Sequence, residues 1–315
     1  FSHYGPNHGK PLEKSQELIE KIYSLLPKGA YIAHSGVTGY GEAFLKRALG
    51  IDIGEVETIA HYRAAQFFCP DVSFILDIGG QDMKCTKVRD GYIEDIVLNE
   101  ACSSGCGSFI DTFATSLRLP IEQFAKEGLL APMPIDLGSR CTVFMNSKVK
   151  QAQKEGATVP DIAAGLAYSV IKNALYKVLK VKDPKELGDH IVVQGGTFYN
   201  EAVLRAFEKL MGVEVIRPDV SGLMGAYGMA LLASEAAEEL QNQHSTLLDS
   251  DGLKSLQVST SMRNCGLCSN NCMLTINAFS DGRTYVTGNR CDRGAGDMIQ
   301  EKHKPVPNMV DVKLR

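Results

Sequence analysis

The sequence predicts an α/β fold with two lobes or more, and three observations support this prediction. The 315 residues, with a mass of 34.2 kDa, exceed what one small domain needs. Short apolar runs alternate along the chain with longer segments of helical periodicity, which is the order typical of α/β proteins. The hydrophobic content of 44% and charged content of 22% are ordinary for a folded protein, so a mostly disordered chain and a coiled coil are excluded.

The first half of the chain contains one strong helix and several strand-like runs. Leu18, Ile22 and Leu25 recur at helical spacing, and Pro27 ends that helix. A turn at Asp90 and Gly91 predicts a hairpin. The elements expected in this half are helix 11–26, strand 31–34, a helix from residue 42, buried strand 73–78, strand 92–98 and helices 108–117 and 143–155.

The second half continues the alternation and then changes character. The elements expected here are helix 160–180, buried strand 191–193, helix 200–211, strand 213–216 and a helix rich in small residues at 221–239. Pro160 suits the first turn of its helix, because proline lacks only an N–H that would be unpaired there. Residues 235–256 are polar and poor in large apolar side chains, and they predict a linker.

The net charge and the pattern of apolar residues argue against two kinds of binding partner, nucleic acid and membrane. The chain has 33 Lys and Arg against 37 Asp and Glu, for a net charge of −4, so we expect no nucleic-acid binding. No run of about 18 apolar residues occurs, so we expect no membrane span. The sequence starts at Phe1 and shows no secretory signal, which favours a fragment of a longer or processed cytoplasmic polypeptide. Cysteines in that reducing compartment are more often metal ligands or redox groups than disulfides.

Glycine-rich turns follow several of the predicted strands. Such turns let backbone N–H groups approach an anion, and the start of a following helix adds favourable charge. The chain has no Walker A sequence and no G-x-G-x-x-G after a strand, which excludes a P-loop and argues against a dinucleotide-binding Rossmann site. These turns alone leave nucleotide binding and simple tight connections as equal alternatives.

Three segments then resemble one known family. Residues 77–82, D-I-G-G-Q-D, resemble the second phosphate loop of the acetate and sugar kinase/Hsp70/actin superfamily. They are most similar to BadF/BadG/BcrA/BcrD-type activator ATPases of 2-hydroxyacyl-CoA dehydratases and benzoyl-CoA reductases. Residues 194–200 resemble the adenosine segment of that family, and 221–228 resemble its closing helix. The resemblance covers about residues 31–235 and implies an actin-like ATPase fold in a fragment of a large fused member.

The resemblance also implies a nucleotide site for ATP or ADP with Mg²⁺. Asp77 would act near the Mg²⁺-bound phosphates, and Asp77 and Gln81 are the candidate catalytic residues. Gly79, Gly80 and Gln81 would cradle phosphate. The residues expected to line the adenosine pocket are Gly195, Gly196, Asn200, Gly222 and Gly225.

Two cysteines precede predicted helices. A helix N-terminus stabilises a thiolate, yet free cysteines are commonly buried, and on the residues alone two buried structural cysteines are the favoured interpretation. Cys102 and Cys141 match the family's N-x-x-C and C-T-V-F segments, which implies that they bind one [4Fe–4S] cluster shared by a homodimer. Cys106 stands where the family has a small residue, so it is either an alternative ligand or a tolerated side chain. Cys69 and Cys85 are expected in the core.

Four further cysteines lie close together near the end of the chain. Cys265, Cys268, Cys272 and Cys291 have a spacing that suits Zn²⁺ and an iron–sulfur cluster equally well. The region is too polar to bury much core, so a bound metal would explain how it folds. Reduced cysteines without metal are the alternative. The larger, fused members of the family carry similar cysteine-rich segments.

The superfamily's first phosphate loop, D-x-G-S/T, has no counterpart before Asp77. The resemblance therefore implies that residues 1–70 are the remainder of a first lobe, 71–240 a second lobe, 241–262 a linker and 263–315 a cysteine-rich metal module. It implies an ATP-dependent electron-transfer activator whose partner is an acyl-CoA dehydratase or reductase. The alternatives are a sugar or small-acid kinase of the same superfamily and a non-catalytic nucleotide-binding scaffold. Whether this chain hydrolyses ATP stays open, and we expect little turnover.

Overall fold

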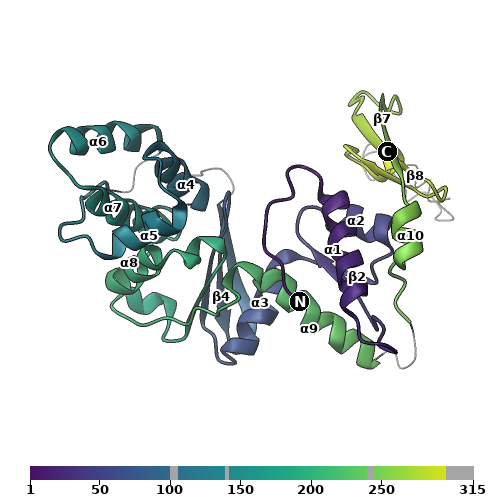
Figure 1. The fold of residues 1–315 in the computed structure, drawn as a ribbon, viewed down its shortest axis with the longest axis horizontal. Helices are drawn as coiled ribbons and strands as arrows, with labels where there is room; N and C mark the ends of the chain where they lie inside the picture. The colour runs from purple at the N-terminus through teal and green to yellow at the C-terminus, as the bar shows by residue number, and fades with distance from the viewer. Residues whose placement is uncertain (100–105, 139–141, 240–243, 296–315) are drawn as a thin grey trace, which may run out of the picture. The chain divides into compact units, whose positions relative to one another are not determined.

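The computed structural model describes residues 1–99, 106–138, 142–239 and 244–295 (Figure 1). The chain divides into two compact units. Unit 1 comprises Phe1–Pro6, Ile32–Glu42 and Ile53–Ser245, and unit 2 comprises Asn7–Tyr31, Ala43–Asp52 and Thr246–Arg315. Each unit is described by itself.

Unit 1 is built on a four-stranded sheet with the order β5-β4-β3-β6. Its strands are β3 (Phe74–Ile78), β4 (Met83–Arg89), β5 (Tyr92–Asn99) and β6 (Ile191–Gln194). β3 pairs antiparallel with β4 and parallel with β6. The predicted hairpin turn between β4 and β5 is confirmed, and Asp90 and Gly91 both adopt positive φ there. A separate pair of parallel strands, β1 (Gly36–Thr38) and β2 (Ile53–Glu55), also belongs to this unit.

Helices cover both faces of the four-stranded sheet. The helices on one face are α4 (Gly107–Ser116), α5 (Ile121–Leu129), α6 (Thr142–Lys154), α7 (Val159–Lys172) and α8 (Glu201–Met211), which gather on one side of the strands in Figure 1. The other face carries α3 (Glu57–Phe68) and the start of α9 (Met224–Glu239). Side chains alternate along a strand, so Phe74, Leu76 and Ile78 pack on the α4–α8 face while Ile75 packs against α3. The same alternation directs Asp77 towards α3.

The contact between α3 and α9 depends on a glycine. A Cβ added at Gly228 of α9 would lie 1.8 Å from the carbonyl oxygen of Ala60 in α3. Glycine therefore lets the two helix backbones approach closely. This close contact holds α3 on its face of the sheet, where α3 supplies part of the candidate functional site.

The structure departs from the predicted elements at four places. Residues 31–34 form no strand, and the strand begins at Gly36. Residues 213–216 contribute a single bridge, between Val192 and Ile216, rather than a strand. The predicted helix 160–180 ends as a regular α-helix at Lys172 and continues as a π-helix over Asn173–Val178. The stretch expected to be a linker contains α10 (Ser250–Ser255) and lies next to the start of a strand.

Unit 2 joins the C-terminal segment to helices from early in the chain. Its elements are α1 (Pro11–Leu25), most of α2 (Glu42–Leu49), α10, the strands β7 (Val258–Asn264), β8 (Met273–Phe279) and β9 (Thr284–Thr287), and α11 (Asp292–Ala295). Leu49, Leu253 and Phe279 are buried together in its core. Arg283 donates hydrogen bonds to the last carbonyls of α2, at Arg47 and Ala48. A separate cysteine-rich module is thus not confirmed, because its sheet shares a core with α1 and α2.

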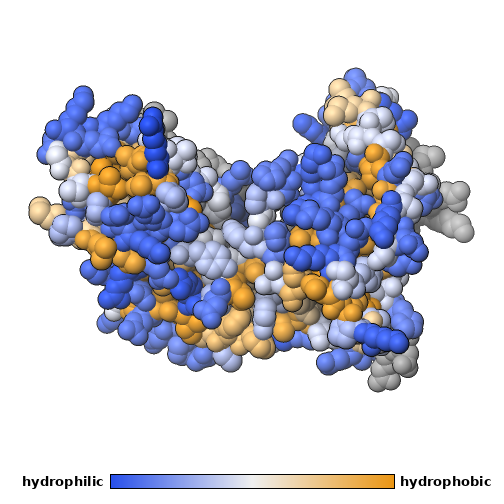
Figure 2. Space-filling view, viewed as in Figure 1, coloured by the Kyte–Doolittle hydropathy of each residue, from blue (hydrophilic) through white to orange (hydrophobic). Residues whose placement is uncertain are grey.

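The surface of α6 is largely hydrophilic (Figure 2). Lys150 and Lys154 of this helix are exposed, while Met145 and Val149 are buried on its inner side. Among the described residues, no helix combines the length and apolar character needed to span a bilayer.

Candidate functional site

Two polar side chains end neighbouring parallel strands at the same edge of the unit 1 sheet. Asp77 of β3 pairs in register with Gln194 of β6, and both side chains are buried. The Gln194 amide Nε2 donates a hydrogen bond to Asp77 Oδ2 over 3.1 Å. Because the carboxyl ends of parallel strands meet at one edge, residues far apart in the sequence become neighbours here.

His61 of α3 completes this cluster. Its Nδ1 forms an ion pair with Asp77 Oδ2 and lies 2.8 Å from Gln194 Nε2, and its Nε2 lies 3.6 Å from Glu57 Oε1. Burial by itself would lower the pKa of His61, but the carboxylates of Asp77 and Glu57 outweigh it and raise that pKa. Burial would likewise raise the pKa of Asp77, and His61, Gln194 and the nearby Lys84 together lower it. Both pKa shifts favour the charged forms of the two groups, as expected for an ion pair.

Lys84 of β4 extends the cluster to the loop that follows β3. Its Nζ lies 2.9 Å from Glu57 Oε2 and 2.7 Å from Asp82 Oδ2. Burial would lower the pKa of Lys84, but its hydrogen bonds and ion pairs with the two carboxylates raise it. The carbonyl of Asp82 also accepts a hydrogen bond from Gly79 N–H over 3.0 Å. A continuous chain of charged groups thus connects α3, the end of β3 and the β3–β4 loop.

The β3–β4 loop is attached to the first turn of α4. Gly79 O accepts hydrogen bonds from Gly107 N and from Thr197 Oγ1, each over 2.9 Å. Gly80 O accepts one from Ser108 N, also over 2.9 Å. The carbonyls of the predicted phosphate loop therefore satisfy N–H groups that a helix N-terminus leaves unpaired. A movement of this loop would be transmitted directly to the start of α4.

The loop after β6 needs glycine at its first position. Gly195 has φ of 92°, and a Cβ added there would lie 2.3 Å from the carbonyl oxygen of Ile78. Gly195 N–H donates to Ser221 O over 2.8 Å, and Ser221 Oγ donates back to Gly195 O over 3.1 Å. The glycine therefore allows the two strand ends and the segment before α9 to meet.

A cavity of about 430 Å³ opens where both glycine loops end. The residues that line it include Gly80, Gly107, Gly196, Thr197, Asn200, Tyr4, Tyr199, Asp111 and Glu122. The Tyr4 and Tyr199 rings meet edge to face, with centroids 5.9 Å apart. Burial and the neighbouring Glu122 raise the pKa of Asp111. The cavity thus combines approachable backbone, aromatic rings and carboxylates, in a volume suited to a small ligand.

The residues expected from the sequence are distributed around this cavity. Gly80, Gly196 and Asn200 line it, and the Asn200 side chain also caps α8 by accepting a hydrogen bond from Ala202 N–H. Gln81 is exposed in the β3–β4 loop. Asp77, Gly79 and Gly195 lie at the strand ends, Gly222 faces the Tyr199 ring, and Gly225 of α9 faces the His61 ring. Their roles towards a nucleotide remain predictions.

Sequence reasoning misses three side chains of this site. His61 is not among the site residues expected from the sequence, although Glu57 precedes it by one helical turn. It includes Gln194 in the segment that resembles the family's adenosine segment but gives its side chain no role, although a polar residue at the end of a fully buried strand is itself a signal. Tyr4 gives no signal, because its place in the cavity depends on the tertiary fold.

The cysteines of unit 1 fall into two groups. Cys102 and Cys141, the predicted cluster ligands, lie outside the described residues. The predicted core positions of Cys69 and Cys85 are confirmed, and Cys106 is buried as well. Burial raises the pKa of the Cys85 thiol to about 12, with a smaller contribution from the charge of Asp77.

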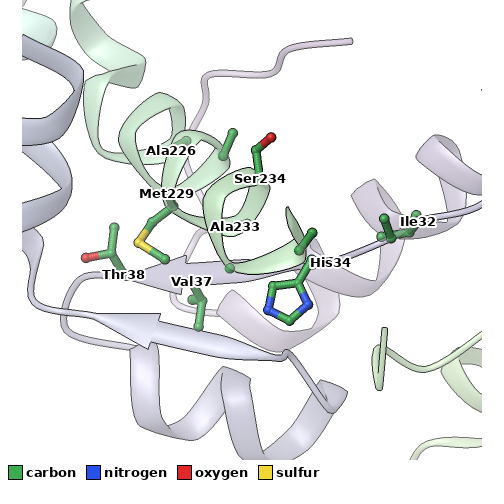
Figure 3. Close-up of a pocket in the computed structure, with 12 residues that line it drawn as sticks. Ile32, His34, Val37, Thr38, Ala226, Met229, Ala233 and Ser234 are labelled. Atoms are coloured by element: carbon green, nitrogen blue, oxygen red, sulfur yellow. The ribbon is translucent and has the colours of Figure 1, made fainter. Parts of the chain in front are cut away.

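A second cavity, of about 690 Å³, lies between α9 and the segment that leads into β1 (Figure 3). Val37, Ala226, Met229 and Ala233 make much of its wall apolar. Figure 3 shows the Met229 side chain of α9 lying beside Thr38 of β1. Gly80 and Gly196 line the first cavity and do not line this one.

These features define a class of protein. A sheet covered by helices on both faces, with two glycine loops at the ends of adjacent parallel strands, is the architecture of one half of an actin-like ATPase. The model of the BadF/BadG/BcrA/BcrD ATPase family matches residues 7–233, and the chain belongs to this family. Its fold is the actin-like ATPase fold.

Characterised relatives share this region of the chain. The 2-hydroxyisocaproyl-CoA dehydratase activator of Clostridioides difficile is 32% identical over 208 residues, which is 66% of this chain and 76% of the relative. The (R)-2-hydroxyglutaryl-CoA dehydratase activating ATPase of Acidaminococcus fermentans is 30% identical over 233 residues, or 74% and 86% of the two chains.

Two solved structures are similar to this one. Component A of the A. fermentans (R)-2-hydroxyglutaryl-CoA dehydratase has a TM-score of 0.64 and 30% identity, covering 75% of this chain and 87% of its own. The activator of the C. difficile 2-hydroxyisocaproyl-CoA dehydratase, with bound ADPNP, has a TM-score of 0.63 and 29% identity, covering 76% and 85%.

Proposed function

We propose that this chain binds ATP or ADP in the 430 Å³ cavity and acts as an ATP-dependent electron-transfer activator of a CoA-thioester dehydratase or reductase. The observation that carries the proposal is the meeting of two glycine loops beside the buried Asp77–His61 pair. Family membership and the dehydratase activators among the relatives support the type of partner. A relative from Thauera aromatica that is named as part of a benzoyl-CoA reductase supports the reductase alternative.

The cavity offers a complementary group for each part of a nucleotide. Gly80 carries no side chain and has open space beside it, so phosphate oxygens can approach the backbone there, while the Tyr4 hydroxyl lies where a Cβ of residue 196 would be. Asp111 and Glu122 can accept hydrogen bonds from ribose hydroxyls, and the Tyr199 ring provides a flat apolar surface for a base.

Magnesium fits the oxygen donors at the strand ends. Gln194 Oε1 is buried and has no hydrogen-bond partner among the described residues, and it belongs to the same side chain that contacts Asp77. Carboxylate and amide oxygens are ligands that Mg²⁺ accepts, together with waters and phosphates. Asp77 and Gln194 would hold the ion, which would neutralise charge on the nucleotide phosphates.

We also propose that Cys102 and Cys141 of two identical subunits bind one [4Fe–4S] cluster. Two thiolates from each chain supply the four ligands that such a cluster needs. Cys141 directly precedes α6, a helix start that favours a thiolate. The cluster, when bound, would supply the single electron for the partner enzyme. The hydrogen bonds from Gly107 and Ser108 to the β3–β4 loop offer a route from nucleotide binding to the segment that carries Cys102.

The nucleotide site is tested by titrating Mg·ADP into the whole chain and a Gly80→Val variant. A Cβ at Gly80 meets nothing within 4 Å and would project into the cavity, so the variant keeps its fold. We expect at least a tenfold loss of affinity, about 1.4 kcal/mol. The exposed Lys150→Ala change is the control and leaves affinity unchanged. Equal affinity of the wild type and Gly80→Val would contradict the proposed site.

The electron-transfer role is tested by anaerobic purification with iron and sulfide analysis. We expect about four irons per dimer, lost in Cys102→Ser. An iron-free chain that phosphorylates a sugar or small acid would favour the kinase, and an iron-free chain that binds nucleotide without turnover would favour the scaffold. Phosphate release should be slow, because no D-x-G-S/T sequence occurs before Asp77. Turnover comparable to that of the complete activators would refute this last expectation.

A further inference from the structure

Four cysteines of unit 2 gather at one end of its three-stranded sheet. β7 and β8 form an antiparallel hairpin whose last registered pair is Asn264 with Met273. The next pair is Cys265 with Cys272, since Cys265 N–H donates to Cys272 O over 2.8 Å. These two residues therefore lie opposite one another, with Cα atoms roughly 5 Å apart, where the two strands leave the sheet.

The loop between β7 and β8 carries the third cysteine. Cys268 O accepts a hydrogen bond from Asn271 N–H over 3.1 Å, which closes a turn. Gly266 and Asn271 both adopt positive φ, at 69° and 42°. This tightly folded loop confines Cys268 to the same end of the sheet as Cys265 and Cys272.

The fourth cysteine reaches this end through β9. β9 runs antiparallel to β8, so it finishes beside the start of β8. A Cβ added at Gly288 would lie 2.2 Å from Met273 O, which shows how closely the chain passes β8 there. Cys291 follows three residues later, and its carbonyl accepts hydrogen bonds from Asn289 Nδ2 and Gly294 N–H. The return of β9 beside β8 therefore brings Cys291 to the same end of the sheet as the other three cysteines, although it is distant from them in the sequence.

These four thiols differ from the three buried ones of unit 1. Cys268 and Cys291 are exposed, Cys265 and Cys272 are half-buried, and all four are free. The neighbouring Leu267 and Met273 are exposed by 59% each, so little apolar core holds this end of the sheet together. Side chains of the described residues do not form a ready group of three or more metal ligands. A metal ion would therefore have to draw the thiols together, which exposed loop side chains can accommodate.

We propose that Cys265, Cys268, Cys272 and Cys291 bind one Zn²⁺ ion as four thiolates. Zinc takes four sulfur ligands in a tetrahedron, with Zn–S distances of about 2.3 Å. Cys265 and Cys272 lie opposite one another and would supply two of the ligands. Cys268 in the β7–β8 loop and Cys291 after β9 would supply the other two. Arg290 and Arg293 flank Cys291 and are exposed, so they offset the net negative charge of such a site. The ion would stabilise the β7–β8 loop and the segment after β9, which the small core of unit 2 leaves exposed.

The test uses the whole chain in a Cys102→Ser background, so that the proposed cluster contributes no metal. After purification under reducing conditions with zinc supplied, elemental analysis should find one zinc per chain. Replacement by cobalt should give the charge-transfer bands of tetrahedral thiolate coordination. Cys268→Ser and Cys291→Ser should each abolish these bands, and the matched loop variant Ser269→Ala should retain them.

A second measurement guards against variants that do not fold. In the chelator-stripped chain, added zinc should protect four thiols from alkylation, and mass spectrometry should identify them as these four cysteines. The proposal would be overturned by a lack of protection by zinc, by unchanged cobalt bands in Cys291→Ser, or by a Cys265–Cys272 disulfide in the reduced preparation. Iron with inorganic sulfide bound in place of zinc would overturn it as well.

Discussion

Replacement of His61 by alanine tests the buried cluster at the strand ends. The His61 and Asp77 side chains are 17% and 10% exposed, so their ion pair is largely removed from water. His61→Ala leaves the Asp77 carboxylate buried without its cation. Breaking a buried pair in this way costs about 3–5 kcal/mol, and the hydrogen bond from Gln194 places the expected loss near 3 kcal/mol. In a domain of this size that corresponds to a fall in melting temperature of about 6–12 °C.

The pH dependence of stability provides a second readout. The pKa of His61 is raised above its usual 6.5, so its contribution is fully present below that pH and is lost as the pH rises through the higher folded value. The pKa of Asp77 is lowered below its usual 3.8, so its contribution is present above that pH and is lost as the pH falls through the lower folded value. The difference between wild type and variant should therefore be largest between these two usual values.

Urea unfolding followed by circular dichroism measures the loss of stability and its dependence on pH. The measurements are made at pH 5.5 and pH 8.5, about one unit below and two units above the usual pKa of histidine. His190→Ala is the matched control, because His190 pairs with Asp71 over 2.9 Å while both side chains are more than half exposed. That change should cost less than about 1 kcal/mol. The reasoning is refuted if His61→Ala costs no more than the control, or if its cost is the same at both pH values.

Three further changes have definite expected outcomes. Gly195→Ala should destabilise unit 1 by about 3 kcal/mol in urea unfolding, whereas Gly156→Ala, with the same φ of 92° but open space around it, should cost about 1 kcal/mol; similar costs would show that backbone strain, not the contact with β3, matters. In the chelator-stripped chain at pH 8, iodoacetamide should label Cys268 and leave Cys85 unlabelled, since burial raises the Cys85 pKa to about 12. Arg283→Ala should lower the stability of unit 2 by about 1–3 kcal/mol, because α2 loses hydrogen bonds at its C-terminus; an unchanged unfolding transition would refute that role.

Much of the secondary structure could be predicted from local chemistry. The apolar runs at β3 and β6 and the glycines after them specify two buried strands that end in tight turns. Pro11 and Pro160 suit the first turns of α1 and α7, and the Asp90–Gly91 pair suits a hairpin turn. These signals act over a few residues, so they are visible without the fold.

The short strands could not be predicted in this way. Residues 31–34 have apolar character, yet the strand forms at Gly36–Thr38, where the backbone pairs with β2. Residues 213–216 form only one bridge for the same reason. A strand of three residues is defined by the partner available to it rather than by its own propensity.

The sequence by itself determined the family, the two glycine loops and the spacing of the C-terminal cysteines, because each is a short run of neighbouring residues. Only the tertiary structure decided how these parts meet. The bond between Gln194 and Asp77 joins positions 117 residues apart, and it exists because β3 and β6 are parallel neighbours. His61 joins them because α3 packs on that face of the sheet, and Cys291 comes to the same end of the unit 2 sheet as Cys265 because β9 returns beside β8. Pairing between distant segments is a property of the whole packed chain, so local patterns cannot specify it.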